Sequence, residues 1–234
     1  SIDMSNFTVA AVTYTGSNGD TATGTAFDAS DVFALNGNTG ADTIKAAAVV
    51  KNNITAGAGD DTIVGNTGVD TIIFGGIAGS ANGSNTITGF TTGTDSLTIS
   101  AMTTGTGSEV ALVSSAGSAI TTTNTKDYVR LLTTDGTAAS IVTSATATLA
   151  VADMTASTLT NVAAFLIEKY SGNSSTTDAD SGVYIINLNH ASDTTKSYMY
   201  QWDNDTTANK IQAAELTLVA TITSNDLGTG DYVG

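Results

Sequence analysis

The chain has 234 residues, 22 acidic and 7 basic, and its net charge of −15 excludes duplex nucleic acid as a partner because no basic patch can neutralise phosphates. Cysteine is absent, which excludes disulfides, zinc–thiolate sites and thiol catalysis. No apolar run approaches the ~20 residues of a membrane-spanning helix, so we expect no membrane span. This length fits one elongated domain or two small ones.

The first 36 residues carry short alternating apolar segments, which predict imperfect strands leading into the next region. No initiator Met or cleavable Sec signal opens the chain. We therefore expect it to be the C-terminal part of a longer protein.

Residues 56–73 contain two nine-residue units in register, A-G-A-G-D-D-T-I-V and G-N-T-G-V-D-T-I-I. Each has glycine at place four, aspartate at place six and isoleucine at place eight. This is the nonapeptide of the calcium-binding parallel β-roll. The glycines allow turns with positive φ, the aspartate offers a hard oxygen ligand and the isoleucine enters a thin core.

Partial copies extend the repeat in both directions. Residues 37–44 form a third good unit, and after a slip at 46–50 the Asp/Asn-x-apolar elements start at residues 31, 42, 52, 61, 70, 85 and 95, about one per coil. The pattern predicts a parallel β-roll, or β-solenoid, over residues 1–104.

Calcium is the ion that these turns predict, concentrated between the turn of Gly57–Asp61 and the turn of Gly65–Asp70. The predicted metal-site residues of the roll are Asp42, as a flanking ligand, with Gly57, Gly59, Asp61, Gly65, Gly68, Asp70 and Asp95. The alternative is a calcium-free solenoid in which the aspartates cap backbone N–H groups. For Asn85 and Asp95 the two interpretations are equally supported.

The repeat ends near residue 100, and residues 105–152 form a predicted connecting region of β-strands. Its β-prone runs are Glu109–Ser114, Tyr128–Thr133 and Ser140–Val151. Threonine is dense here, and its β-branching favours strands.

Residues 153–234 predict a smaller, β-rich α+β module. One apolar stripe predicts a helix through Leu159, Val162, Ala163, Leu166 and Tyr170, with Ser157 as N-cap and Ser171-Gly172 as its end. Three strands should follow, at Val183–Leu188, Ser197–Trp202 and Leu216–Thr223.

A second candidate calcium loop lies in this module, with oxygen side chains at Asp203, Asp205, Asn209 and Glu215. Its spacing approximates an EF-hand loop but is one residue too long and lacks the central glycine, so it is not an EF-hand. The alternative is a plain aspartate-rich hairpin.

The sequence contains no recognisable catalytic motif. His190 is the single histidine, and no G-x-S-x-G elbow accompanies it. None of the 22 acids is singled out as half of a hydrolytic pair. We therefore expect the chain not to be an enzyme.

The nonapeptides resemble those of RTX (repeats-in-toxin) proteins, most strongly over residues 37–100. Residues 86–100 are similar to the sequence that often closes such rolls, although Gly89 stands where the family usually has aspartate. The loop from Asp203 to Leu216 also resembles loops near the C-termini of RTX surface proteins. The resemblance implies type I export from a Gram-negative bacterium, an extracellular or cell-surface location and calcium-dependent structure. Residues 225–234 lie where such proteins usually keep the export signal.

The closest resemblance is to the C-terminal region of RTX-containing bacterial surface-layer proteins. It implies a structural protein that assembles with copies of itself into a lattice or filament, with cell-surface polysaccharide as a further partner. Two alternatives remain open: the C-terminal region of an RTX adhesin, and the secretion and folding module of a secreted hydrolase.

Overall fold

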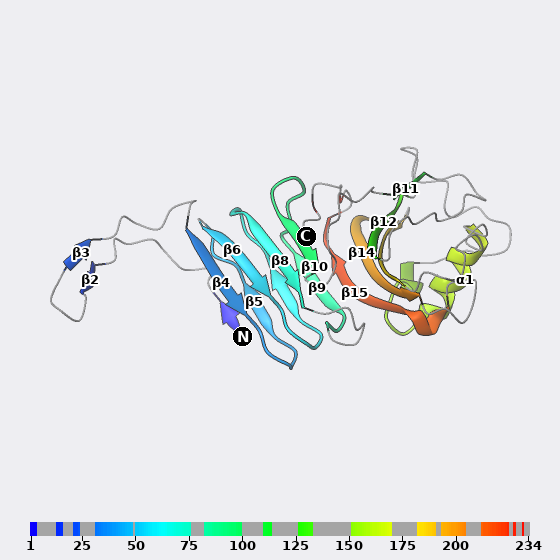
Figure 1. Ribbon diagram of the computed structural model, residues 1–234, viewed down its shortest axis with the longest axis horizontal. Helices are drawn as coiled ribbons and strands as arrows, with labels where there is room; N and C mark the ends of the chain where they lie inside the picture. The colour runs from blue at the N-terminus through cyan, green and yellow to red at the C-terminus, as the bar shows by residue number, and fades with distance from the viewer. Residues whose placement is uncertain are drawn as a thin grey trace.

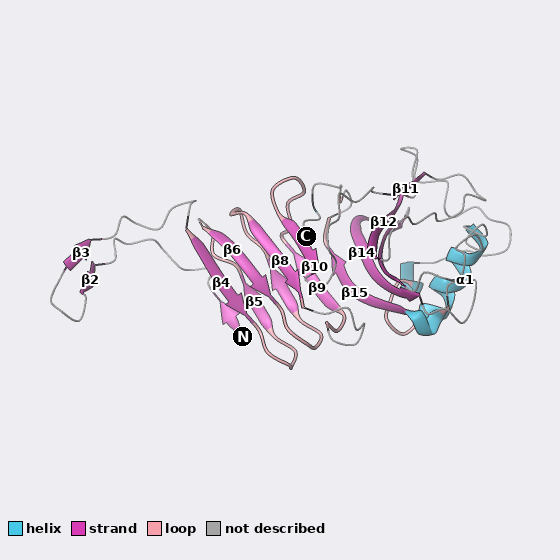
Figure 2. Ribbon diagram, viewed as in Figure 1, coloured by secondary structure: helices cyan, strands magenta, loops and turns pink. Residues whose placement is uncertain are grey.

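The computed structural model describes residues 1–3, 13–15, 21–23, 31–48, 50–75, 82–99, 110–113, 126–132, 151–169, 182–190, 193–204, 212–224, 227 and 231. Strands dominate this part of the chain, and one α-helix lies at the far end from the N-terminal strands (Figure 1, Figure 2). The prediction of a mainly β fold is confirmed. No described helix is long and apolar enough to cross a membrane.

Residues 31–99, called the roll from here on, wind between two sheets of parallel strands. One sheet has the order β10 (Ser96–Ile99), β8 (Asp70–Phe74), β6 (Lys51–Thr55) and β4 (Val32–Asn36). The other begins with β1 (Ile2–Asp3), β5 (Thr43–Lys45), β7 (Thr62–Val64) and β9 (Asn85–Thr88). Successive strands of the roll alternate between the two sheets. Apart from it, β2 (Thr13–Thr15) and β3 (Thr21–Thr23) pair as an antiparallel hairpin.

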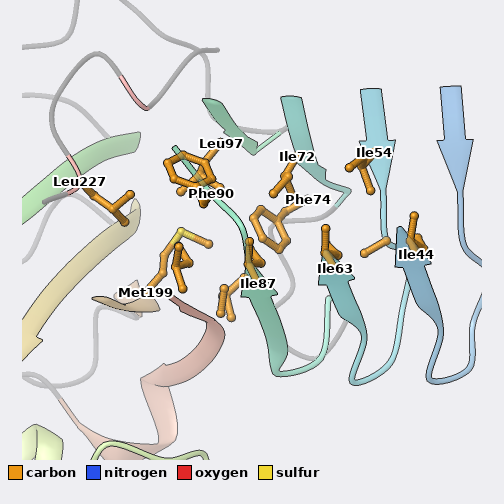
Figure 3. Packing of buried hydrophobic residues seen from close by; sticks show 14 of the residues in the cluster. Ile44, Ile54, Ile63, Ile72, Phe74, Ile87, Phe90, Leu97, Met199 and Leu227 are labelled. Atoms are coloured by element: carbon orange, nitrogen blue, oxygen red, sulfur yellow. The ribbon is translucent and has the colours of Figure 1, made fainter. Parts of the chain in front are cut away.

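The apolar residue of each repeat fills the space between the sheets. Register aligns Ile44, Ile63 and Ile87 in one sheet and Leu35, Ile54, Ile72 and Leu97 in the other. All seven are buried in one hydrophobic core, and Figure 3 shows Ile44, Ile63 and Ile87 facing Ile54, Ile72 and Leu97 between the two sheets. Each such isoleucine contributes about 2–3 kcal/mol of hydrophobic stabilisation, which is why the spacing of place eight sets the register.

This arrangement corrects two details of the predicted roll. Each nonapeptide supplies half a coil rather than a whole one, because consecutive units lie in opposite sheets. The predicted element Asp31-Val32-Phe33 is also out of register, since Leu35 pairs with Ile54 while Phe33 pairs with Asn52. In β4 both Phe33 and Leu35 are apolar, so either could take the core place of the repeat. Leu35 is the buried residue, and this sets the register.

The second sheet continues without a break into the C-terminal part of the chain. After β9 it runs through β15 (Leu216–Ile222), β14 (Asp193–Asn204), β13 (Gly182–His190), β12 (Lys126–Leu132) and β11 (Val110–Val113). β15 pairs parallel with β9 and places Ile222 beside Ile87. Met199 and Leu227 close the end of the roll's core (Figure 3). The sheet therefore spans the predicted boundary at residue 153, and the domain limits stay predictions.

Five predicted strands outside the roll are present with end shifts of a few residues, as β11 to β15. The run Ser140–Val151 lies outside the described residues except for Val151, which opens a 3-10 turn, Val151–Asp153.

The predicted helix is α1, Leu159–Lys169. Its stripe of Val162, Ala163 and Leu166, joined by Phe165, packs in a second core with aromatic residues of β14. Thr158, not Ser157, directly precedes the helix, and its hydroxyl donates to the Asp153 carbonyl at 2.6 Å. Tyr170 of the predicted stripe and the predicted helix end, Ser171-Gly172, lie outside the described residues.

Candidate functional site

A polar residue lies two places before every core isoleucine or leucine of the roll except Leu35, and it stacks on its counterpart in the next coil. In the sheet of β5, β7 and β9 these residues are Asp42, Asp61 and Asn85, called the first ladder. In the sheet of β6, β8 and β10 they are Asn52, Asp70 and Asp95, called the second ladder. Each ladder lies where the turns enter its sheet, so the two ladders occupy opposite edges of the roll, called the first edge and the second edge after their ladders.

In the first ladder the side chains of Asp61 and Asn85 accept hydrogen bonds from the backbone of the preceding coil. Asp61 Oδ1 accepts from the Asp42 amide at 2.8 Å, and Asn85 Oδ1 accepts from the Asp61 amide at 2.9 Å. The Asn85 amide group then donates to the carbonyls of Asn82 at 2.8 Å and Val219 at 3.0 Å. An amide suits this place because the next strand, β15, presents a carbonyl where a carboxylate would be repelled.

In the second ladder Asp95 Oδ1 accepts from the Asp70 amide at 2.8 Å, repeating the backbone pattern. Between Asn52 and Asp70, the preceding pair of this ladder, the donor is a side chain instead of a backbone amide. The side-chain Nδ2 of Asn52 donates to Asp70 Oδ1 at 2.7 Å, while the backbone amide of Asn52 goes to the Val69 carbonyl at 2.9 Å.

The second carboxylate oxygen usually caps the turn that carries it. Asp42, Asp70 and Asp95 each accept from the backbone amide four residues earlier, of Asn38, Asn66 and Thr91, at 2.9, 2.9 and 2.7 Å. These turns are the aspartate-capped turns of the calcium-free alternative.

Asp61 departs from this pattern. The residue four places earlier is Gly57, whose φ of +96° lies in the left-handed region, whereas no described non-glycine residue has a positive φ. The Gly57 amide makes no described bond to Asp61. Asp61 is only 1% exposed, and its Oδ2 has no hydrogen-bond partner. A buried carboxylate oxygen without a donor is costly, and such an atom in a native protein commonly marks a bound ion or water.

Burial raises the pKa of three ladder carboxyls. Desolvation raises the pKa of Asp70 to about 6, against the hydrogen bonds from Asn66 and Asn52 that lower it. Desolvation also raises the pKa of Asp61, with the charges of Asp42 and Asp60 adding to the effect. The pKa of Asp95 is raised by burial and, less strongly, by the charge of Asp231.

The glycines of the predicted site serve two different purposes. Gly57 and Gly59 have φ of +96° and +117°, as a positive-φ turn requires. Gly65 and Gly68 do not have positive φ. They are glycine because a Cβ would meet the neighbouring coil, at the Gly89 carbonyl for Gly65 and the Val50 carbonyl for Gly68.

The prediction that the turns of Asp61 and Asp70 flank a common calcium site is wrong. Those turns belong to consecutive half-coils and lie on opposite edges, so Asp61 stacks on Asp42 while Asp70 stacks on Asn52 and Asp95. Within the described residues no three acidic, histidine or cysteine side chains gather as a metal centre. An ion would therefore draw most of its oxygens from the backbone or water.

The donor sets decide which edge fits calcium. Calcium takes oxygen ligands, and the first edge offers Asp61 Oδ2, an oxygen that no N–H group occupies. On the second edge all four carboxylate oxygens of Asp70 and Asp95 already accept N–H groups. Asp61 therefore offers an oxygen free of N–H donors whereas Asp70 and Asp95 offer none, so a calcium ion fits the first edge better than the second.

One contact at the roll's last turn has no signal in the sequence. Asp231, buried near the C-terminus, accepts from the Gly93 amide at 2.6 Å, inside the turn that Asp95 caps. The C-terminal segment thus reaches the second ladder across more than a hundred positions of chain.

The second candidate loop does not assemble from its described residues. Glu215 is buried, and its Oε2 accepts from the Trp202 indole at 3.0 Å and the Gln212 amide at 2.9 Å. Asp203 is exposed, and strand alternation puts it on the opposite face of β14 from Trp202. Glu215 is thus a capping and packing residue. Asp205 and Asn209 lie outside the described residues.

His190 is the last residue of β13, in register with Asp193. Its side chain is outside the described set, so its role stays a prediction.

Comparison with known proteins gives one family. Residues 17–162, more than half of the chain, match the family described as peptidase M10 serralysin C terminal. This range contains the whole roll and reaches into α1. No curated protein matches the chain.

Proposed function

The chain belongs to the peptidase M10 serralysin C-terminal family, and on that premise we propose that it is a non-catalytic, calcium-stabilised folding module of a secreted protein. The family is of the RTX type, and serralysin-type domains belong to secreted proteins. Proteins of this kind generally bind calcium. The proposal places the ion at the first edge of the roll.

The observation that carries the proposal is the unpartnered Oδ2 of Asp61. Asp61 also lies near the charges of Asp42 and Asp60, so negative charge gathers at this turn. Asp61 would supply the carboxylate ligand, and backbone carbonyls of the stacked turns or water would complete the shell.

Calcium, when bound, supplies positive charge that offsets these carboxylates. Because the ion binds the folded turns and not the unfolded chain, it adds stability by mass action. The chain has 19 aspartates and a net charge of −15, which oppose compaction where calcium is scarce. Millimolar calcium outside the cell matches the ~10⁻⁴–10⁻³ M affinities of extracellular modules.

The continuous sheet extends this effect beyond the roll. β9 belongs to the first-ladder sheet and pairs with β15, which pairs with β14. An ion that fixes the turn of Asp61 therefore stabilises the surface on which the C-terminal strands assemble. This fits a module whose work is folding after export, and it requires no catalytic residue.

A calcium titration tests the proposal. We expect calcium to raise the melting temperature of the whole chain, and the Asp61→Asn variant to lose most of this rise. The matched control is Asp203→Asn, the same chemical change at an exposed position. If Asp203→Asn abolishes the response and Asp61→Asn keeps it, the ion lies in the C-terminal loop and the assignment to Asp61 is wrong.

A surface-layer or matrix subunit is the second candidate function. It is supported by β4, the outermost described strand of its sheet, where Val32 is 52% exposed. Strand edges of this kind favour pairing with another chain, here a copy of itself. Negative-stain images should show a lattice or filament in calcium that dissolves in chelator, whereas a monomer at high concentration contradicts the idea. Adhesion and binding of cell-surface polysaccharide stay predictions.

A further inference from the structure

Asn52 holds a place in the second ladder that the repeat pattern gives to aspartate. Its side chain and that of Asp70 are both 0% exposed, and its Nδ2 lies 2.7 Å from Asp70 Oδ1. The other hydrogen bonds of Asn52 fix the orientation of the amide. Oδ1 accepts from the Ala47 backbone amide at 3.2 Å, and Nδ2 also donates to the carbonyls of Ala47 at 3.0 Å and Val50 at 3.2 Å.

An aspartate at this place would change the chemistry of the edge. The distance between Nδ2 and Oδ1 would become a distance between two buried carboxylate oxygens. Two carboxylates that share a buried site cannot both stay charged without a proton or a cation between them. The side-chain N–H groups of Asn52 meet the same need in the chain as it is.

We infer that Asn52 is a built-in substitute for a cation, which keeps the second edge of the roll free of calcium and confines ion binding to the first edge. Asn52 is thus a specificity-determining residue of the roll. The inference rests on the proposed function only in taking calcium as the ion of the first edge. The full use of the Asp70 and Asp95 oxygens by N–H donors supports it.

The Asn52→Asp variant of the whole chain tests the inference, with Asn53→Asp as matched control. Asn53 is the next residue of β6 and is exposed, so its variant adds the same charge without burying it. In EDTA we expect Asn52→Asp to melt well below Asn53→Asp. In millimolar calcium we expect this gap to close, and calorimetric titration should count one more ion for Asn52→Asp than for Asn53→Asp. Equal melting in EDTA, or no added ion, overturns the inference.

A second variant keeps the test decisive if Asn52→Asp does not fold. The double variant Asn52→Asp/Asp70→Asn exchanges the acid and the amide, which restores one donor and one acceptor at the same contact. We expect it to melt in EDTA above Asn52→Asp and to gain no ion, but to stay below the wild type because residue 52 no longer donates to the Ala47 and Val50 carbonyls. If it is as unstable as Asn52→Asp, the contact is not a donor–acceptor pair and the inference fails.

The two proposals fail separately. If the wild type binds no calcium, the proposed function is wrong, while an ion gained by Asn52→Asp still supports the role of Asn52. If Asp70→Asn alone lowers the wild-type ion count, the second edge binds calcium and the inference is wrong, while calcium-dependent folding stands.

Discussion

The two edges of the roll carry the same residue at the same place of the repeat and treat it differently. Asp70, on the second edge, has both oxygens satisfied by N–H donors, one of them from Asn52. Asp61, on the first edge, has one oxygen satisfied and one buried without a partner. The nonapeptide places a carboxylate in a turn, but the donors around it decide whether the carboxylate needs an ion. One aspartate of a tandem pair can therefore be a structural cap while the other is a ligand.

Removing the carboxylate of each edge in turn should give the largest difference in stability between the two edges. In chelator Asp70→Ala leaves the part-buried Asn66 amide without an acceptor and removes one of the three acceptors of Asn52 Nδ2, which together cost about 2 kcal/mol. Asp61→Ala leaves only the Asp42 amide without an acceptor and also removes an oxygen that had no partner, so we expect it to cost about 1 kcal/mol. Urea unfolding in EDTA measures both. Equal losses would mean that the edges do not differ.

The amide at the end of the first ladder provides the next test. Asn85→Asp replaces a donor to the Val219 carbonyl with a charged acceptor, and we expect a loss of about 2 kcal/mol. The damage should reach β15, so hydrogen exchange of its backbone amides should quicken. The exposed substitution Asn53→Asp should leave that exchange unchanged. Protection of β15 in Asn85→Asp would show that the bond to Val219 does not hold the strand.

Acidity should affect the second edge through Asp70, whose folded pKa of about 6 lies above its ordinary value of 3.8. As pH falls, the folded state takes up a proton before the unfolded chain does, so stability rises toward acid and is lost as pH rises through 6. Lowering the pH from about 7 to about 5 in chelator should therefore raise the free energy of unfolding by about 1 kcal/mol through Asp70. Asp70→Asn should flatten that part of the thermal pH profile. The same slope in this variant would assign the effect to other carboxyls.

The smallest change in stability is expected for the conservative substitution of Asp61. Asp61→Asn in chelator should change stability by less than about 1 kcal/mol, since the amide oxygen can still accept from Asp42 and a buried charge is removed. In calcium the same variant should have a lower melting temperature than the wild type. Melting curves with and without the ion check both halves. A large loss in chelator would mean that the Asp61 charge itself stabilises the apo roll.

Much of the roll could be predicted from the sequence, because its register depends on local spacing. Ile63 and Ile72 each follow an aspartate by two places, and that spacing alone puts them in the core. The alternation between two sheets could not be predicted, since a nine-residue period fits a half-coil as well as a coil. The predicted register of β4 is wrong because Phe33 and Leu35 are both apolar, and only the pairing with β6 shows which of them takes the core place.

The site could be predicted as residues but not as chemistry. The sequence pattern predicts the same role, that of a calcium ligand, for Asp61 and Asp70. Their difference arises from the φ of Gly57 and from the partner that register gives Asp70, and neither can be seen in one nonapeptide. Glu215 was predicted as a ligand because its spacing fits a loop, while its partner, the Trp202 indole, is set by tertiary packing.

The pairing of β9 with β15 has a kinetic consequence. Neighbouring coils bring together residues 18 to 25 positions apart, whereas the bond from Asn85 to Val219 spans 134. Closing the larger loop costs more chain entropy and is slower to attempt. The junction should therefore set the pace of refolding, and a circularly permuted chain that opens between β14 and β15 and joins the old ends should refold at a different rate while keeping the same native contacts.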